Sequence, residues 1–157
     1  MNDTETTAIT VSSDPRRLDV AVVHGFLTQS YWSPGIPRHV VERAIAHSIC
    51  FGAYDGEEQV GFARVVSDRA TYAYVCDVFV LPAHRGRGVG KLIMAAIMSH
   101  PELQGLRRWS LATRDAHGLY RQYGFGDLRH PERAMEVFTD RPYGVPLGQP
   151  RAEGGQP

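Results

Sequence analysis

The chain has 157 residues, of which 43% are hydrophobic and 22% are charged, and this composition predicts one globular domain with a sizeable core. Its 17 lysines and arginines balance 17 aspartates and glutamates, which argues against a protein that coats nucleic acid through a basic face. The apolar stretches are too short to span a membrane, and the first residues lack the pattern of a secretory signal. We therefore expect a cytoplasmic protein with neither a nucleic-acid nor a membrane partner.

The first third of the chain is predicted to form one strand and two helices. Residues 8–13 have strand chemistry, and the Asp-Pro pair at 14–15 is a typical helix-start signal. Apolar residues continue from there at the helical period as far as residue 32. A break containing Pro and Gly at 33–37 separates this helix from a second one at 38–48.

The middle of the chain is rich in strands. Residues 49–54 and 59–68 are predicted to form a hairpin, because the Asp-Gly pair between them tolerates the positive φ that tight turns demand. A longer strand follows at 70–81. Cys50 and Cys76 lie within these strands, and we expect them to be reduced core residues. The sequence shows no Cys/His cluster of the zinc-binding type, so we predict no metal site.

The last part of the chain continues the alternation of helices and strands. A helix at 91–100, a strand at 106–113, a short helix at 115–125 and a final strand at 134–139 follow one another. This order predicts a single mixed α/β domain. The expected organisation is a flexible N-terminus, one folded domain and a disordered tail rich in Pro and Gly, at residues 1–7, 8–140 and 141–157.

A glycine-rich segment, RGRGVGK at 85–91, joins the long strand to the helix after it. Its G-x-G-x-G spacing matches neither the triphosphate loop G-x-x-x-x-G-K-[ST] nor the dinucleotide fingerprint G-x-G-x-x-G. Bare backbone at a helix N-terminus still offers free N–H groups and a positive dipole end. Arg85, Arg87 and Lys91 add positive charge beside it. The segment therefore predicts a pyrophosphate site, and the alternative is a helix start with a solvated basic rim.

The stretch VFVLPAHRGRGVGKLI resembles the acetyl-CoA loop of the GNAT superfamily of N-acetyltransferases, whose signature [QR]-x-x-G-x-[GA] follows a strand and opens a helix. Arg85 fills the first position of this signature, Gly88 the fourth and Gly90 the sixth. A second stretch, DAHGLYRQYGF, is similar to a later family element, a short helix that carries Tyr and ends in Gly-Phe. The resemblance extends over residues 8–138.

The resemblance implies a fold and an activity. The fold is a central, mostly antiparallel sheet of six to seven strands, with splayed central strands and about four flanking helices. The activity is direct transfer of an acetyl group from acetyl-CoA, the cosubstrate, to a primary amine of a small molecule or peptide. A homodimer is common among similar proteins. The alternative is that the chain is a non-catalytic module on the same fold, which binds acyl-CoA or has a regulatory role.

The resemblance also implies a cofactor-binding surface that combines the glycine loop with the end of the long strand. The strand backbone is expected to pair with the pantetheine arm as a peptide pairs with a sheet edge. One backbone N–H, that of Phe79 or a neighbour, is expected to stabilise the oxyanion of the tetrahedral intermediate. The residues predicted to bind the cofactor are Val78, Phe79, Val80, Arg85, Gly86, Arg87, Gly88, Val89, Gly90, Lys91, Thr113 and Tyr120.

Tyr120 occupies the position of the family's catalytic tyrosine, and we expect it to stabilise or protonate the leaving thiolate. Tyr123 is the competitor, although its place beside a glycine suits packing better. The base that deprotonates the amine is left open. Asp77 is the first candidate, because a lone carboxylate in a central strand is costly unless it is hydrogen-bonded or used, and His117 is the second. Tyr74 stands where some relatives carry a catalytic Glu.

Two further contacts are predicted beside the thioester. Tyr31 and Trp32 lie next to a Pro/Gly break, and large aromatics on such a loop can hold the acceptor substrate. The alternative is that they fill the core at a helix end. Thr113 is the nearer match to a family residue that binds the pantetheine amide, and Asp115 is expected to cap the short helix.

Overall fold

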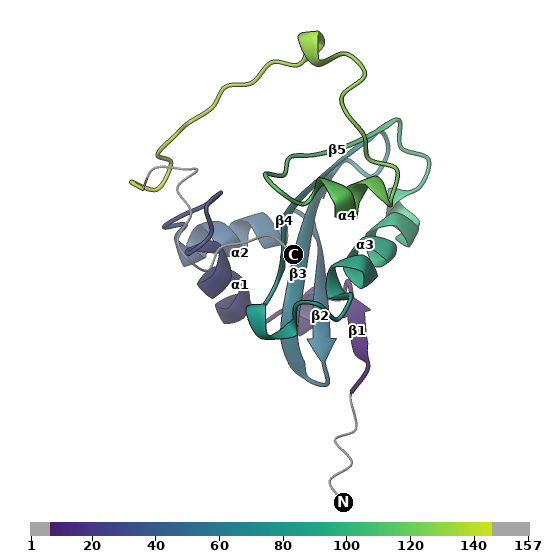
Figure 1. Cartoon of the computed structure of the whole chain (residues 1–157). Helices are drawn as coiled ribbons and strands as arrows, with labels where there is room; N and C mark the ends of the chain where they lie inside the picture. The colour runs from purple at the N-terminus through teal and green to yellow at the C-terminus, as the bar shows by residue number, and fades with distance from the viewer. Residues whose placement is uncertain (1–6, 146–157) are drawn as a thin grey trace, which may run out of the picture.

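The computed structural model describes residues 7–145, and the predictions for residues 1–6 and 146–157 lie outside them. A sheet lies between helices in this part of the chain (Figure 1). The strands are β1 (Ile9–Ser12), β2 (Ile49–Asp55), β3 (Glu58–Ser67), β4 (Tyr72–Val80) and β5 (Arg108–Leu111). The helices are α1 (Val20–Leu27), α2 (Arg38–Ala46), α3 (Val89–Ser99) and α4 (His117–Arg121), and the single 3-10 turns are η1 (Pro15–Arg17), η2 (Pro82–His84), η3 (Pro101–Leu103) and η4 (Pro131–Arg133).

The strands follow one another across the sheet in the order β1-β2-β3-β4-β5. Neighbours are antiparallel as far as β4, and β4 and β5 are parallel. The β2–β3 turn has the expected glycine, because Gly56 adopts a φ of 61°. The mixed, mostly antiparallel sheet with four helices confirms the predicted fold class. The predicted number of strands is not confirmed, since residues 7–145 form five strands where six to seven were expected.

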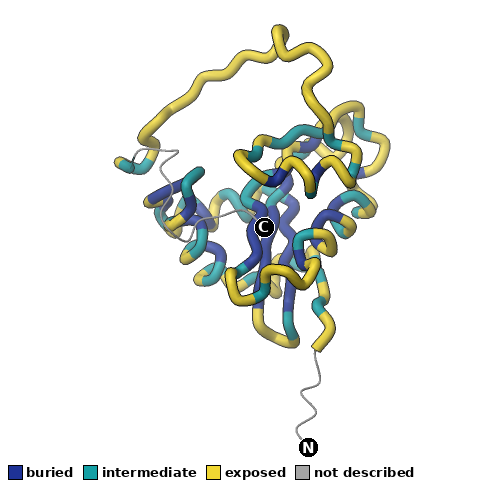
Figure 2. The backbone as a smooth tube through the Cα atoms, viewed as in Figure 1, coloured by how far each residue is buried: buried dark blue, intermediate teal, exposed yellow. Residues whose placement is uncertain are grey.

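Two apolar clusters hold the helices to the sheet, one on each face. The pair α1 and α2 covers one face, and the pair α3 and α4 covers the other (Figures 1 and 2). Side chains that follow one another in a strand point to opposite faces. Phe51 therefore belongs to the α3–α4 cluster, whereas its neighbour Cys50 joins Phe62 and Phe79 in the α1–α2 cluster. The central strands are buried from both sides, which fixes the backbone that carries the candidate site.

The first helix begins later than the sequence predicts. Asp14 does act as a cap, but only of the single turn η1, where its carboxylate accepts a hydrogen bond from the backbone N–H of Arg16 at 3.0 Å. The chain then extends through Leu18, and Asp19 caps α1 through bonds to the next turn. Two Asp caps lie five residues apart in the sequence, and the second one starts the helix. The helix also ends at Leu27 rather than at residue 32.

The segment predicted as the final strand, residues 134–139, is not a strand in the structure. It belongs to an extended arm, residues 126–145, that leaves the end of α4, passes through η4 and arches toward the α1–α2 side (Figure 1). Near its far end Tyr143 packs against the α1–α2 cluster. The prediction was wrong because strand chemistry is local, whereas a strand also needs a partner strand, and residues 134–139 pair with none among the described residues.

Tyr54 is expected to lower the stability of the fold through its hydroxyl. The side chain is 1% exposed, and its hydroxyl is the enclosed side-chain atom without a hydrogen-bond partner among the described residues. Removing the hydroxyl ends this unfavourable burial while keeping the ring beneath the Arg17 guanidinium, 4.1 Å from the ring centroid. Tyr54→Phe should therefore raise the free energy of unfolding by about 1 kcal/mol, measured by urea denaturation. A loss of stability would show that the hydroxyl has a partner.

Candidate active site

The central strand β4 bulges at Asp77, whose φ of 53° lies in the left-handed region that non-glycine residues rarely adopt. The β3–β4 register shifts at the same place, between Phe62 and Arg64, as an extra residue in one strand requires. β5 pairs with β4 only along Tyr72–Val75. Beyond the bulge, the β4 backbone up to Val80 therefore has one edge with no described strand beside it. This is the splay that the resemblance implies.

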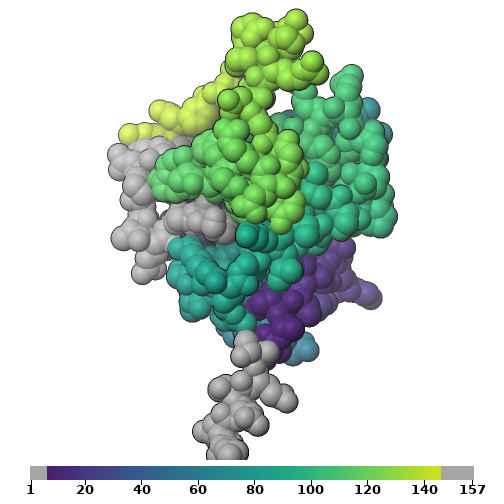
Figure 3. Space-filling view, turned by 45° about the vertical axis from the view of Figure 1, so that its right-hand side comes forward, coloured from purple at the N-terminus to yellow at the C-terminus, as the bar shows by residue number. Residues whose placement is uncertain are grey.

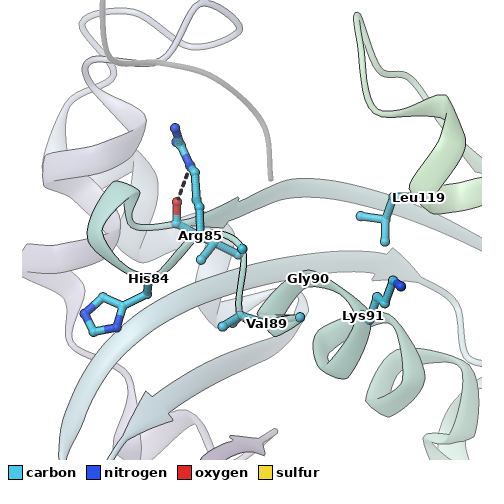
Figure 4. Close-up of a pocket in the computed structure, with 9 residues that line it drawn as sticks. His84, Arg85, Val89, Gly90, Lys91 and Leu119 are labelled. Carbon is cyan, nitrogen blue, oxygen red and sulfur yellow. Dashed lines mark hydrogen bonds between the residues drawn. The ribbon is translucent and has the colours of Figure 1, made fainter.

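A pocket of about 190 Å³ lies where β4 ends and α3 begins (Figure 4). Gly86 and Gly88 have φ angles of 79° and 73°, so the backbone turns there in a way that suits glycine. Helix α3 starts with a bond from the N–H of Leu92 to the carbonyl of Gly88, which leaves the N–H groups of residues 89–91 without helical partners. Such an end attracts anions. The lining residues are Val80, His84, Arg85, Gly86, Gly88, Val89, Gly90, Lys91 and Leu119.

The predicted basic residues of the loop have different surroundings. Arg85 lines the pocket, and its Nε donates a hydrogen bond to the carbonyl oxygen of Val80 at 3.1 Å (Figure 4). This bond ties the loop to the end of β4. Arg87 turns away, because its guanidinium lies 3.0 Å from the Asp55 carboxylate and 3.1 Å from Nδ1 of His84. Contact between Arg87 and the cofactor stays a prediction.

The two tyrosines of the α4 region have separate environments. Tyr123 donates its hydroxyl to the backbone carbonyl of Lys91 at 2.9 Å, so it joins the end of α4 to α3 and has a packing role. Tyr120 is 3% exposed, and its hydroxyl makes no hydrogen bond within residues 7–145. Burial raises the pKa of Tyr120 well above its ordinary value, and Tyr31 and Asp115 nearby raise it further. The phenol is therefore protonated, and its role as the acid stays a prediction.

Asp77 is held at both carboxylate oxygens. Oδ1 accepts a hydrogen bond from the indole N–H of Trp32 at 2.8 Å, and Oδ2 pairs with Nε of Arg64 at 2.8 Å. Burial lowers the pKa of Arg64, and Asp77 more than offsets this, so that the pKa is raised overall. Arg64 also donates to the Ser48 hydroxyl at 3.2 Å. Asp77 as the base stays a prediction, and its contacts favour the structural alternative.

The aromatic pair on the α1–α2 loop has two different roles in the structure. Trp32 packs against the α1–α2 cluster, 6.1 Å from the ring of Phe26, which agrees with the core-filling alternative. Tyr31 instead reaches across to the β5–α4 loop, where the Arg114 guanidinium lies 4.1 Å from its ring centroid. This contact bridges the two sides of the splayed strands. A role of either residue in holding the acceptor stays a prediction.

The start of α4 differs in one detail from the sequence prediction. The predicted cap Asp115 pairs with Arg114 at 3.5 Å, and the helix is instead preceded by Ala116. α4 has no side-chain cap, and the Thr113 hydroxyl accepts the N–H of Ala116 at 3.0 Å in the loop before the helix. His117 lies at the first position of α4, exposed to solvent.

The structure brings together most of the predicted cofactor residues, and it adds two pocket residues and one partner of Asp77 that the sequence did not indicate. The end of β4 and the glycine loop share one pocket, while Val78 and Phe79 place their side chains in the two cores and leave only backbone for binding. The missed residues are His84, Leu119 and Arg64. The first two are adjacent to predicted residues, a signal that could have found them. Arg64 contacts Asp77 because of the register in which β3 pairs with β4, and no pattern within either strand predicts that contact.

The remaining predictions concern the thiols, metals and membranes. Cys50 and Cys76 are free, as expected, and burial raises the pKa of each to about 12. Within residues 7–145 there is no group of three or more His, Cys, Asp or Glu side chains that could hold a metal ion. The same residues contain no helix of the length and apolarity that a membrane crossing needs. The cytoplasmic location stays a prediction.

Comparison with known proteins agrees with this geometry. The family model of the GNAT acetyltransferase domain matches residues 46–126. A protein of Gibberella zeae named as acetyltransferase FG08082 is 32% identical over 143 residues, which cover 76% of this chain and 80% of that protein. The chain therefore belongs to the GNAT family of acetyltransferases.

Two further relatives support the same assignment. A crystal structure of a GNAT-family acetyltransferase from Xanthomonas campestris pv. campestris is 52% identical, with a TM-score of 0.86, and the match covers 88% of this chain and 98% of that one. Serotonin N-acetyltransferase 2, chloroplastic, of Oryza sativa subsp. japonica is 29% identical over 135 residues, covering 80% of this chain and 68% of that protein.

Proposed function

We propose that the protein moves an acetyl group from acetyl-CoA directly to a primary amine of a small molecule or peptide. The observation that carries this proposal is the continuity between the glycine pocket and the unpaired edge of β4, which meet at Val80. The pyrophosphate of the cosubstrate would bind the free N–H groups at the start of α3. Its pantetheine arm would then extend along β4 as an added strand.

The proposed chemistry divides between backbone and side chains. A backbone N–H at Phe79 or a neighbour would stabilise the oxyanion that forms when the amine attacks the thioester carbonyl. The amine must first be neutral, and a lysine-like amine with a pKa near 10.4 costs about 4.6 kcal/mol to deprotonate at pH 7. Tyr120, protonated because burial raises its pKa, would donate to the departing sulfur. The alternative of a non-catalytic module does not account for this proton donor.

Calorimetric titration with CoA, acetyl-CoA, ATP and NAD tests the cofactor part of the proposal. Binding of CoA and acetyl-CoA alone is expected, and binding of ATP without CoA would contradict it. Gly88→Ala should weaken CoA binding about tenfold, because a side chain at positive φ costs about 1–2 kcal/mol and displaces the loop. Gly105→Ala is the matched control, since Gly105 has a similar φ of 71° and neither added Cβ meets an atom within 4 Å. Equal CoA affinity in the two variants would remove the loop from the site.

The acceptor can be found by measuring thiol release from acetyl-CoA with a panel of primary amines. Arylalkylamines belong in that panel, because the rice relative is named as a serotonin N-acetyltransferase and because Tyr31 and Trp32 lie near the splayed strands. Polyamines, aminoglycosides and lysine peptides complete it. Acetylation of an amine supports the proposal, whereas hydrolysis of acetyl-CoA without any amine product contradicts it.

A further inference from the structure

Arg114, in the loop between β5 and α4, holds its guanidinium over the ring of Tyr31, 4.1 Å from the ring centroid. Stacking uses the flat face of a guanidinium and leaves the N–H donors at its edges able to bind an oxygen ligand. The same guanidinium also pairs with Asp115, at 3.5 Å. Charge-assisted hydrogen bonds are shorter, about 2.7–2.9 Å, so this pair restrains Arg114 without satisfying its donors.

The Arg114 side chain is oriented by these contacts and is still accessible. It is 44% exposed, and its loop and α4 lie on an exposed face of the molecule (Figure 3). Arg64 is a contrasting case, because its side chain is 21% exposed and donates to both Asp77 and Ser48. A half-buried arginine with two hydrogen-bond partners supports the fold, whereas a stacked and accessible arginine is suited to bind a ligand.

The contacts of Arg114 also place it near the candidate catalytic phenol. Burial raises the pKa of Tyr120, and Tyr31 and Asp115 raise it further, so the two residues that contact Arg114 lie close to this hydroxyl. Tyr31 belongs to the α1–α2 loop, so its contact with Arg114 crosses the splay between β4 and β5. An amine that reaches a thioester beside Tyr120 would therefore pass the Arg114 guanidinium.

The charge around α4 favours an acidic ligand. A groove of about 960 Å³ lies between β5, α4 and residues 124–130, and Thr113, His117 and Tyr120 belong to its lining. Five arginines and one aspartate line the same groove. A cleft lined by one sign of charge raises the local concentration of ligands of the opposite sign. An acceptor with a second cationic group, such as a diamine, would be repelled by this lining.

We propose that Arg114 binds a carboxylate of the acceptor substrate, and that the acceptor is a small amine with an acidic group, such as an amino acid. The planar fork of a guanidinium matches the two oxygens of a carboxylate. Tyr31 is the positioning residue, because its ring fixes the plane of that fork. This inference rests on the proposed acetyl transfer and narrows its acceptor. In that reaction the amine nitrogen bonds to the acetyl carbon, the C–S bond breaks, and the proton that the amine loses is balanced by the proton that the CoA thiol gains.

Acetyl transfer to matched pairs of amines tests the acceptor class. Phenylalanine is compared with phenethylamine, and 4-aminobutyrate with n-propylamine, because the second amine of each pair lacks only the carboxylate of the first. With thiol release and product mass as readouts, we expect kcat/KM to be about tenfold or more higher for the acidic member of at least one pair. Equal use of both members, or preference for the amine without a carboxylate in both pairs, would overturn the inference and leave acetyl transfer itself in place.

Arg114→Gln and Arg129→Gln form a matched pair of variants. Each removes one guanidinium near α4, but Arg129 is an exposed residue of the groove, whereas Arg114 stacks on Tyr31. Arg114→Gln should lower the preference for the acidic acceptor about 10–100-fold, and Arg129→Gln should change it by less than about threefold. Arg114→Lys keeps the charge without the planar fork, so it should keep only part of the preference. Equal effects of the two glutamine variants would show that the overall charge selects the acceptor and would overturn the role of Arg114.

Calorimetric titration of the two amino acids into the full chain saturated with CoA tests the contact without the reaction. Arg114→Gln should weaken binding of the tighter amino acid about 10–100-fold. Tyr31→Phe keeps the ring against the guanidinium and should retain the affinity, whereas Tyr31→Leu should lower it about two- to fivefold. Binding that depends on Arg114 without any acetylated product would contradict the proposed acetyl transfer and support the carboxylate site. If neither amino acid binds or is acetylated, the inference is wrong.

Discussion

Tyr120→Phe is expected to lower the turnover of acetyl transfer by about 10²–10⁴-fold, the range that a positioned general acid contributes. The ring stays in place, 6.2 Å from the centroid of Phe125, so packing is kept and only the proton donor is lost. The affinity for acetyl-CoA should change much less than turnover, because the hydroxyl matters most when charge develops on sulfur. Steady-state kinetics with varied acetyl-CoA and a saturating amine measure both quantities.

Tyr123→Phe is the matched control for this variant. It removes a hydroxyl from the same helix end, but this hydroxyl donates to the backbone carbonyl of Lys91 at 2.9 Å. We expect a loss of stability of about 1 kcal/mol with turnover nearly unchanged. Equal turnover in Tyr120→Phe and the wild type would remove Tyr120 from the mechanism.

The pH dependence of turnover gives an independent check on Tyr120. Burial raises the pKa of this phenol above its ordinary value of about 10, so its protonated form persists through that pH. Because the folded state binds the phenolic proton of Tyr120 more tightly than the unfolded state does, the hydroxyl loses this proton only as the pH rises through the raised pKa. Turnover should therefore show no alkaline decline from this group below about pH 10.

The sequence predicted those features that depend on neighbouring residues. The glycine loop is an example, because the positive φ of Gly86 and Gly88 and the start of α3 are local properties. The Asp-Gly turn before β3 is another. In each case glycine adopts a positive φ that few other residues tolerate, so a short sequence pattern is enough to predict the turn. The family resemblance then supplied the roles of the pocket and of Tyr120.

The features that the sequence did not predict depend on partners far away in the chain. Arg64 meets Asp77 because β3 and β4 pair with a bulge at that point, and register cannot be read from either strand alone. The segment 134–139 has the composition of a strand but pairs with no strand within residues 7–145. Asp115 pairs with Arg114 instead of capping α4, and this depends on the path of a loop. Composition and periodicity carry none of this information.

Replacing Asp77 should destabilise the fold more than removing the hydroxyl of Tyr120 or Tyr123. Its side chain is 12% exposed and that of Arg64 is 21% exposed, so Asp77→Ala leaves a largely buried guanidinium without its counter-charge. We expect a loss of about 3–5 kcal/mol in the free energy of unfolding, measured in urea. The indole N–H of Trp32 loses its acceptor as well. The bulge that splays β4 from β5 is then no longer held by the contacts of Trp32 and Arg64 with the Asp77 carboxylate.

Asp77→Asn and Arg64→Met separate the charge from the shape of this contact. Asparagine tolerates the positive φ at this position and can still accept from Trp32, so Asp77→Asn should cost less than Asp77→Ala. The double variant should be more stable than the sum of the two single losses by about 1–3 kcal/mol, because neither charge is then left unpaired. If Asp77→Asn instead keeps wild-type stability and abolishes turnover, the carboxylate acts as the base that deprotonates the amine. Stability and turnover lost together indicate a residue that positions the splayed strands, which is the outcome that its two hydrogen bonds favour.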